Sequence, residues 1–387
     1  MAKINKNDFK TVFPYIKSVI KSEKYLSDLL IEKGKDTLTL SFFSFTHSGK
    51  GVKATMPAKG NDEWKTYLRG RSGMGILELI EKTNAEEIEL TLSEKSVILK
   101  TPDTKIKMAV VEGTEDPTED EEWETIAENL PSQDFKNLFV PHKYIIGEDP
   151  YYPNVFLLLK RENKELSVAS SDSYILVKNK KEVSAEALNI ETLALPLYFP
   201  IITEALSDSP MKIEKAKNKD LVKITIKENE EKITVQIFFA LVDKSYPDYE
   251  RILNSTEEAG LIFQANPKEL LSVLNKASLL AIERNFVTLQ TDKDTNTVTV
   301  KIEDKTGLFK ATLNTPVQET QKMYIGIKNL RTILNAFISS DEKTFFFYWE
   351  EKNPYRIVAG DMVVLAAPFV AIEEEKEEEK EIEREAA

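Results

Sequence analysis

Apolar residues recur at three- and four-residue spacing in six segments of the chain, a pattern typical of helices with one buried face. The clearest segment spans residues 8–22, where lysines occupy a different face from the apolar positions. Pro14 stands late for a first-turn proline, so this pattern predicts a kink or a later start. Pro131 and Pro267 suit first turns. The other expected helices are at residues 73–82, 130–139, 197–206, 266–280 and 330–338.

Alternating, β-favouring runs between these helices repeat in the same order. Hairpins with charged turns are expected at 30–40, 157–168 and 287–300; Leu38 and Leu166 are 128 positions apart, and Leu166 and Val298 are 132 apart. Repeats of this length suit whole domains rather than a solenoid. We predict an α+β protein with domains at 1–125, 126–254 and 255–372, followed by an acidic tail at 373–387.

Residues 244–253 stand where the second copy passes into the third and are unusually aromatic for a linker. Pro247 fixes its own φ and favours extended geometry at Tyr246, so we expect a stiff, non-helical run through Ile252. Two interpretations are open on composition. The run is either a packed strap between domains or one wall of a binding groove.

Composition places the chain among soluble globular proteins. Its 387 residues are 41% hydrophobic and 30% charged, and two or three domains are expected at this length. There is no cysteine, which excludes disulfides and thiolate chemistry and is compatible with a reducing compartment. No run of about 18 apolar residues and no signal-peptide core occurs, so we expect a cytoplasmic protein without membrane contact.

The net charge of −13 is unevenly distributed. Residues 112–134 hold ten acidic and no basic side chains, and residues 373–387 hold nine Glu against three basic residues. The remainder therefore carries a small net positive charge. A polyanionic partner is compatible with this distribution, although the sequence shows no strong positive signal for binding one.

Candidate catalytic residues are sparse. His47 and His142 lie in different copies and have no metal-ligand spacing. The glycines of residues 70–75 lack the order of a dinucleotide fingerprint and are expected in a loop. Gly49-Lys50-Gly51 lacks the other positions of a phosphate-binding loop. We expect no enzyme, no metal and no cofactor. The alternative is an enzyme acting on an acidic or sugar-like substrate, but the sequence shows no convergent set of acid–base residues for it.

Four strings resemble the bacterial DNA sliding clamps, the DNA polymerase III β subunits that act as processivity factors, and mark this chain as a divergent member. Residues 246–253 (Tyr-Pro-Asp-Tyr-Glu-Arg-Ile-Leu) are similar to the family's Phe-Pro-Asp-Tyr-Arg-Arg-Val-Leu, the most specific of the four. Residues 171–176 resemble its Thr-Asp-Gly/Ser-His-Arg-Leu run. Residues 325–327 resemble the opening of its last helix, and residues 364–369 resemble its terminal Val-Met-Pro-Met-Arg-Leu.

The resemblance implies three similar domains, each with two helices packed on antiparallel sheets, and two chains closing head to tail into a ring around duplex DNA. The implied partners are double-stranded DNA without sequence specificity, the replicative DNA polymerase, the clamp loader and other proteins that carry a clamp-binding peptide. The alternative is a three-domain scaffold or phage-type interaction protein that keeps the architecture without encircling DNA.

The resemblance also implies site residues. The groove between the second and third domains would take a partner peptide on Pro153, Ser171, Ser173, Tyr174, Ile175, Leu176, Pro247, Arg251, Ile252, Pro368, Phe369 and Val370. The residues expected to face DNA are Lys10, Lys17, Lys21, Lys136, Lys143, Lys268, Lys276, Lys328 and Arg331. The expected dimer interface joins Ile106 and Met108 on an edge strand to Leu279 and Leu280 on a helix; on sequence alone these four are equally compatible with a core position.

The chain departs from the family at several of these positions. Tyr174-Ile175 replaces a His-Arg pair and Phe369-Val370 replaces Met-Arg, which predicts a more apolar groove. The acidic tail has no counterpart in the family.

Overall fold

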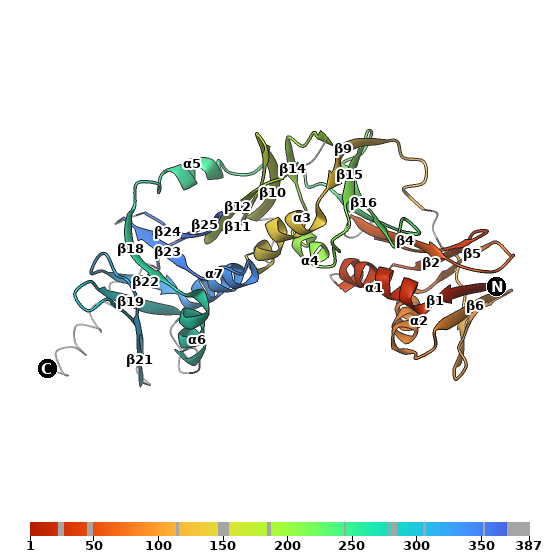
Figure 1. Ribbon diagram of the computed structural model, residues 1–387, viewed down its shortest axis with the longest axis horizontal. Helices are drawn as coiled ribbons and strands as arrows, with labels where there is room; N and C mark the ends of the chain where they lie inside the picture. The colour runs from red at the N-terminus through yellow and green to blue at the C-terminus, as the bar shows by residue number, and fades with distance from the viewer. Residues whose placement is uncertain are drawn as a thin grey trace. The chain divides into compact units, whose positions relative to one another are not determined.

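A computed structural model describes residues 1–21, 27–44, 49–113, 116–145, 155–183, 187–243, 245–277, 279, 285–304, 307–350 and 353–369 (Figure 1). Its contacts divide the chain into two compact units. Unit 1 comprises Met1–Asn137, Lys160–Glu165 and Glu182–Asp243. Unit 2 comprises Leu138–Leu159, Leu166–Lys181 and Lys244–Ala387.

The order of elements repeats three times, as the sequence pattern predicts: a strand, a helix, a group of strands, a second helix and three further strands. The helices of the described residues are α1 (Lys6–Lys21), α2 (Gly70–Lys82), α3 (Ser132–Phe139), the 3₁₀ helix η1 (Val140–Tyr144), α4 (Phe199–Thr203), α5 (Tyr249–Asn254), α6 (Pro267–Ala277) and α7 (Ile327–Ser339). The second copy opens with β9 at Trp123, slightly before the predicted boundary at 126. The contacts group the chain differently from three domains, and those boundaries stay a prediction.

Unit 1 contains a long sheet with strand order β13-β9-β15-β16-β17-β4-β3-β2-β5 and a second sheet with order β1-β6-β7-β8. Helix α1 packs on β4 and β17 and beside α2 (Figure 1). The strands are β1 (Ala2–Asn5), β2 (Leu29–Lys33), β3 (Thr37–Ser44), β4 (Lys50–Pro57), β5 (Trp64–Leu68), β6 (Glu87–Ser93), β7 (Ser96–Lys100), β8 (Lys105–Ala109), β9 (Trp123–Leu130), β13 (Ala187–Leu188), β15 (Met211–Ala216), β16 (Leu221–Glu228) and β17 (Ile233–Ala240), with β14 (Thr192–Ala194) also in this unit.

Strand β17 pairs with β4 in antiparallel register, Ile237 opposite Val52, so one sheet joins the first copy to the second. Both residues are fully buried. Apolar side chains of the two strands are therefore buried side by side where the two copies join.

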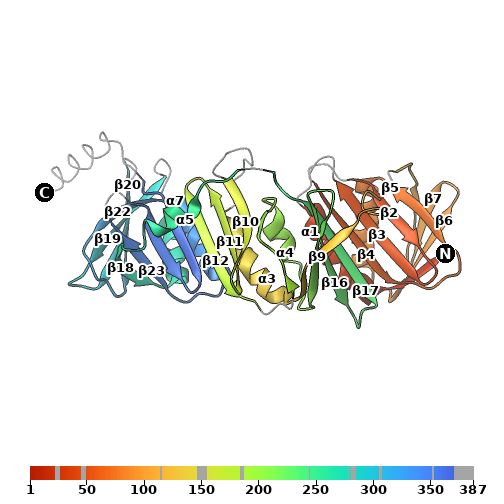
Figure 2. The same cartoon turned by 90° about the horizontal axis from the view of Figure 1, so that it is seen from above.

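Unit 2 contains a sheet with order β10-β11-β12-β25-β24-β23-β18 and a second sheet with order β21-β20-β19-β22 (Figure 2). Helices α6 and α7 pack side by side, and their buried faces share a core with both sheets. The strands are β10 (Val155–Glu162), β11 (Glu165–Asp172), β12 (Ile175–Glu182), β18 (Gly260–Ala265), β19 (Phe286–Asp292), β20 (Thr297–Asp304), β21 (Gly307–Asn314), β22 (Lys322–Gly326), β23 (Phe345–Trp349), β24 (Tyr355–Ala359) and β25 (Met362–Ala366).

Three local predictions are wrong. Helix α1 starts earlier than expected, at Lys6, and runs through Pro14, which is exposed. The glycines of residues 70–75 lie in α2 rather than in a loop. A Cβ on Gly73 would stand 2.6 Å from the Cβ of Leu29, so glycine here lets α2 lie directly against β2.

The third wrong prediction is the non-helical run at 244–253, because its second half forms α5. The side chain of Asp248 accepts a hydrogen bond from the Arg251 N–H (3.1 Å), which caps the helix. Residues 245–248 lie outside any helix, so the prediction fails only from Tyr249 on. In the described ranges, no helix is long and apolar enough to cross a bilayer.

Candidate functional site

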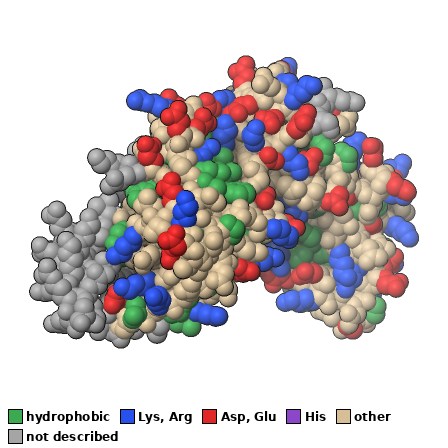
Figure 3. Space-filling model, turned by 60° about the vertical axis from the view of Figure 1, so that its left-hand side comes forward, with side chains coloured by type: hydrophobic (Ala, Val, Ile, Leu, Met, Phe, Trp, Pro, Cys, Tyr) green, Lys and Arg blue, Asp and Glu red, His purple; other side chains and the backbone are tan. Residues whose placement is uncertain are grey.

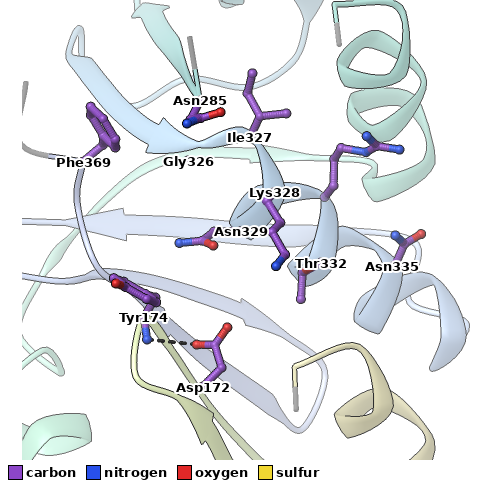
Figure 4. Close-up of a pocket in the computed structure, with 11 residues that line it drawn as sticks. Asp172, Tyr174, Asn285, Gly326, Ile327, Lys328, Asn329, Thr332, Asn335 and Phe369 are labelled. Carbon is purple, nitrogen blue, oxygen red and sulfur yellow. Dashed lines mark hydrogen bonds between the residues drawn. The ribbon is translucent and has the colours of Figure 1, made fainter. Parts of the chain in front are cut away.

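A hollow of about 750 Å³ opens in unit 2 (Figure 4). It is lined by residues from the turn before β12, from just before β19, from the end of β22, from α7 and from the chain beyond β25. The lining residues are Asp172, Tyr174, Asn285, Gly326, Ile327, Lys328, Asn329, Arg331, Thr332, Asn335 and Phe369. Two of these, Tyr174 and Phe369, are predicted groove residues.

The tight turn between β11 and β12 positions Tyr174. Asp172 Oδ1 accepts the N–H groups of Tyr174 (2.9 Å) and Ile175 (2.7 Å), and Ser171 Oγ accepts the N–H of Ser173 (3.1 Å). Ser173 has a φ of 81°, a left-handed conformation that is costly for a serine. The turn leaves the Tyr174 side chain 66% exposed at the rim of the hollow.

The chain beyond β25 is held on the other side of the hollow. The Ala367 N–H donates to the Tyr174 carbonyl (2.9 Å), and the Phe369 N–H donates to the Tyr324 carbonyl (3.0 Å). The Phe369 ring stacks on Phe286, with ring centroids 4.6 Å apart. Tyr174 and Phe369 therefore form two aromatic walls with fixed backbones.

A second surface lies across the large sheet of unit 2, under α5. Leu176, Leu365 and Arg356 are opposite one another on β12, β25 and β24, so their side chains share one face. Arg356 Nη1 donates to the carbonyl of Leu253 at 3.3 Å, which places α5 over this face. Leu176 is consequently 8% exposed, and its face is the one that α5 partly covers.

The segment containing α5 is anchored at its other end on β10. The Phe156 ring lies 5.6 Å from the ring of Tyr249 and 6.3 Å from that of Tyr246. Arg251 is exposed and Ile252 is 42% exposed, although Leu253 and Tyr249 are buried. The segment is therefore a packed strap that also presents apolar surface at Ile252. That it is one wall of a binding groove stays a prediction.

Ile175 does not reach either surface. Its neighbours across β25 and β24 are Ala366 and Tyr355, and all three belong to the core of unit 2. Because successive strand residues point to opposite faces, Leu176 and Ile175 cannot both face a peptide, and the structure corrects the expectation for Ile175. Pro368 is half-buried next to Phe369, and Pro247 is half-buried before α5. Pro153 and Val370 lie outside the described residues.

Lys328 and Arg331, which the resemblance assigns to DNA, line the hollow. Sequence reasoning missed this role, as well as the contributions of Asp172, Asn285 and Asn335. The three- and four-residue spacing of positions 328, 331, 332 and 335 was visible as one helical face, but the sequence does not show what that face meets.

The remaining basic residues expected to face DNA lie on helices. Lys10 and Lys17 are exposed on α1, and Lys268 and Lys276 are exposed on α6; the side chain of Lys21 is not described. Lys143 of η1 lies over the Tyr144 ring at 4.8 Å. Lys136 Nζ donates to the Leu206 carbonyl at 3.4 Å, which restrains it. On the face shown in Figure 3, basic and acidic side chains are interspersed in small groups.

The expected interface residues are at the surface. Ile106 and Met108 are half-buried on β8, an edge strand. Leu279 is 80% exposed but follows the end of α6 at Ala277, so it lies in a turn and not on the helix. Leu280 lies outside the described residues. A second open edge, β21, was not predicted as an interface; Leu308 on it is 54% exposed.

Among the described residues, no group of three or more acidic or histidine side chains could hold a metal ion. His142 is fully buried, and its Nδ1 lies 2.7 Å from Ser170 Oγ. Burial lowers the pKa of His142 to about 3. The imidazole is therefore neutral and out of contact with solvent, as in a structural core.

The architecture matches solved structures along almost the whole chain. A DNA polymerase sliding clamp from Pseudomonas aeruginosa, solved with a ligand, superposes with a TM-score of 0.78 at 12% sequence identity, over 96% of this chain and 100% of that chain. The DNA polymerase III subunit beta of the same organism superposes with a TM-score of 0.77 at 13% identity over the same shares of the two chains.

Sequence comparisons find no counterpart: no family model matches the chain, and no curated protein matches it. At 12–13% identity the structural likeness shows the fold. The chain is an α+β protein with the sliding-clamp fold, as the resemblance of its four strings implies.

Proposed function

From its sliding-clamp fold, we propose that this chain is a cytoplasmic, non-catalytic DNA sliding clamp. Two copies close head to tail around duplex DNA and tether the replicative DNA polymerase, which makes synthesis processive. The observation that carries this proposal is the fold match over 96% of this chain and 100% of a solved clamp.

Ring closure is supported by two open sheet edges, β8 in unit 1 and β21 in unit 2. Each presents unpaired backbone groups and half-buried apolar side chains, Ile106 and Met108 on one and Phe309 and Leu313 on the other. Such edges pair readily with another strand. Edge-to-edge pairing of β8 from one copy with β21 from the next would continue the sheets from chain to chain.

Sliding on DNA is supported by dispersed lysines rather than by a concentrated patch. Lys10, Lys17, Lys268 and Lys276 are exposed on helices and can meet phosphates without reading bases. Weak, sequence-independent attraction is what a sliding protein requires. The short helix α4, which has no basic residue, would contribute little to DNA contact.

Tethering is supported by the hollow beside Tyr174 and Phe369 and by the apolar surface around Ile252. Both lie in unit 2, and both present exposed or half-exposed anchoring positions of the kind that short peptides use. We propose that the polymerase, the clamp loader and other proteins with a clamp-binding peptide dock here in turn.

Topology provides the decisive experiment. The full chain is loaded by its cognate loader onto nicked circular DNA, and retention is followed by gel filtration before and after linearisation. We expect retention on circles and loss from linear DNA, together with a native mass twice that of one chain. Equal retention on both forms would instead support the scaffold that keeps this architecture without encircling DNA.

A further inference from the structure

The described chain ends at Phe369, beside two cations of α7. Phe369, Lys328 and Arg331 all line the hollow in unit 2, and Figure 4 shows Lys328 extending across its middle. The end of the described chain is fixed there, because the Phe369 N–H donates to the Tyr324 carbonyl (3.0 Å) and its ring stacks on Phe286. Whatever follows Phe369 in the sequence therefore starts close to this positive charge.

The sequence that follows leads into the acidic tail at 373–387, which holds nine Glu against three basic residues. The step from Phe369 to the first glutamate, Glu373, spans at most about 14 Å of extended chain. The first glutamates of the tail are thus held near Lys328 and Arg331 by the chain itself. A charged segment on so short a connection has a high effective concentration at a nearby site of opposite charge.

Neither cation is neutralised within the described structure. Lys328 is exposed and Arg331 is half-buried, and neither makes an ion pair or a side-chain hydrogen bond with another residue of the described ranges. Asp172 is the one acidic residue among those that line the hollow, and its Oδ1 already accepts two backbone N–H groups. The positive charge of Lys328 and Arg331 is therefore available to another acidic group.

Cations beside the other end of α7 differ in this respect. Lys343 Nζ donates to Asp341 Oδ1 (2.5 Å), just beyond the C-terminal end of α7. The pKa of the Asp341 carboxyl is lowered, first by this hydrogen bond and the charge of Lys343 and then by the charge of Lys268. Lys268 and Lys343 thus share an acidic neighbour within the fold. An acidic segment gains more at the start of the helix, beside Lys328 and Arg331, than at its end.

We propose that the acidic tail folds back onto Lys328 and Arg331 and has to be displaced from them before duplex DNA binds. The inference rests on the proposed function, which gives these two cations to DNA, and adds a regulatory segment to it. The tail glutamates and the DNA phosphates compete for the same positive charge, so the tail lowers the affinity of the free protein for duplex. A ring already closed around DNA keeps the duplex by topology, so the competition acts mainly on the unloaded protein.

Cross-linking tests the contact without relying on any DNA function. A carbodiimide joins a carboxylate to an amine with no spacer, and peptide mapping by mass spectrometry locates the link. In the full chain at low salt we expect links from the first glutamates of the tail to Lys328, which disappear at high salt. A blunt-ended duplex of about 20 base pairs should remove the same links. Lys3 and Glu87, whose side chains lie 3.0 Å apart in unit 1, provide a control link that should form with and without DNA.

Fluorescence anisotropy with the same duplex, labelled with fluorescein, tests the competition. A chain ending at Ile372 keeps every described residue, and we expect it to bind duplex about five- to tenfold more tightly than the full chain at low salt. In the Lys328→Gln/Arg331→Gln background, removal of the tail should change the affinity by less than about twofold. Lys268→Gln/Lys343→Gln is the matched control, because it removes two positive charges of the same unit that lie near Asp341. The full effect of tail removal should persist there.

Two results overturn the inference and leave the proposed function intact: the absence of links between the tail and Lys328, and an equal effect of tail removal in all three backgrounds. Links that persist at saturating duplex overturn it as well, because the tail would then not be displaced. Absence of duplex binding by every variant would contradict the proposed function and the competition together. The links measured without DNA would still show whether the tail contacts Lys328.

Discussion

The ring of Phe369 stacks on the ring of Phe286 with centroids 4.6 Å apart and planes inclined by 23°. Phe286 in turn contacts Tyr324 edge to face at 5.9 Å, and the Tyr324 carbonyl accepts the Phe369 N–H. The last described residue of the chain is thus held by a ring contact and a backbone bond on β19 and β22. This arrangement makes the aromatic wall of the hollow rigid before any ligand arrives, which lowers the entropy lost on binding.

Truncating the anchoring positions should weaken a partner peptide without unfolding the protein. We expect Phe369→Ala and Ile252→Ala each to cost about 1–2 kcal/mol of binding free energy, and the double variant about 2–4 kcal/mol. Isothermal titration with a clamp-binding peptide measures this. Leu79→Ala is the control, since Leu79 is 40% exposed on α2 of the other unit. Unchanged affinity of the double variant would show that the peptide binds elsewhere.

Ring closure through the open edge β21 and ring closure through the turn after α6 predict different effects of mutation. If β21 closes the ring, Leu308→Lys should place a charge at the joint and shift the native mass from two chains to one. Leu279→Ser, at the position that sequence resemblance favours, should leave the mass unchanged. Sedimentation equilibrium at micromolar concentration compares the two variants. The reverse result, with Leu279→Ser alone producing single chains, would assign closure to the residues after α6.

Burial of His142 should make unfolding sensitive to mild acid. Its pKa in the fold is about 3, below the ordinary value of about 6.5, so the unfolded chain binds the proton first. The contribution to stability is complete above about pH 6.5 and is lost as the pH falls towards 3, by about 1.4 kcal/mol for each pH unit. Urea unfolding between pH 7 and pH 4.5 measures this slope.

His142→Gln provides the comparison, because glutamine can still hydrogen-bond to Ser170 but does not titrate. The variant should lose stability at pH 7, as expected for a repacked core, yet show a shallower decline towards pH 4.5. Parallel slopes for the two proteins would mean that other groups carry the acid sensitivity.

Several features were readable from the sequence because they depend on local periodicity. The apolar spacing within α1, α6 and α7 and the alternation in the hairpins predicted their elements, and the repetition of that order predicted three copies. The four strings pointed to the clamp fold, which the structural comparisons confirm. Each element and each string is a short local stretch, and the repetition compares such stretches along the chain, so no knowledge of distant contacts was needed.

The site depended on contacts that local patterns do not encode. Alternation along β12 assigns Ile175 and Leu176 to opposite faces, but only the register with β25 and the position of α5 decide which face is the core. Asp248 caps α5, which replaces the second half of the expected non-helical run. The edge status of β21 follows from the order of the whole sheet.

By itself, the sequence determined most of the elements and their threefold order, because side-chain periodicity and backbone preference act over a few residues. The clamp fold followed from the resemblance of the four strings to a known family. Only the tertiary structure decided that Lys328 and Arg331 share a hollow with Tyr174 and Phe369. These residues come from three segments far apart in the chain. What brings them together is the pairing of β12 with β25 and the packing of α7 beneath them, which are free-energy minima of the whole unit rather than of any one stretch.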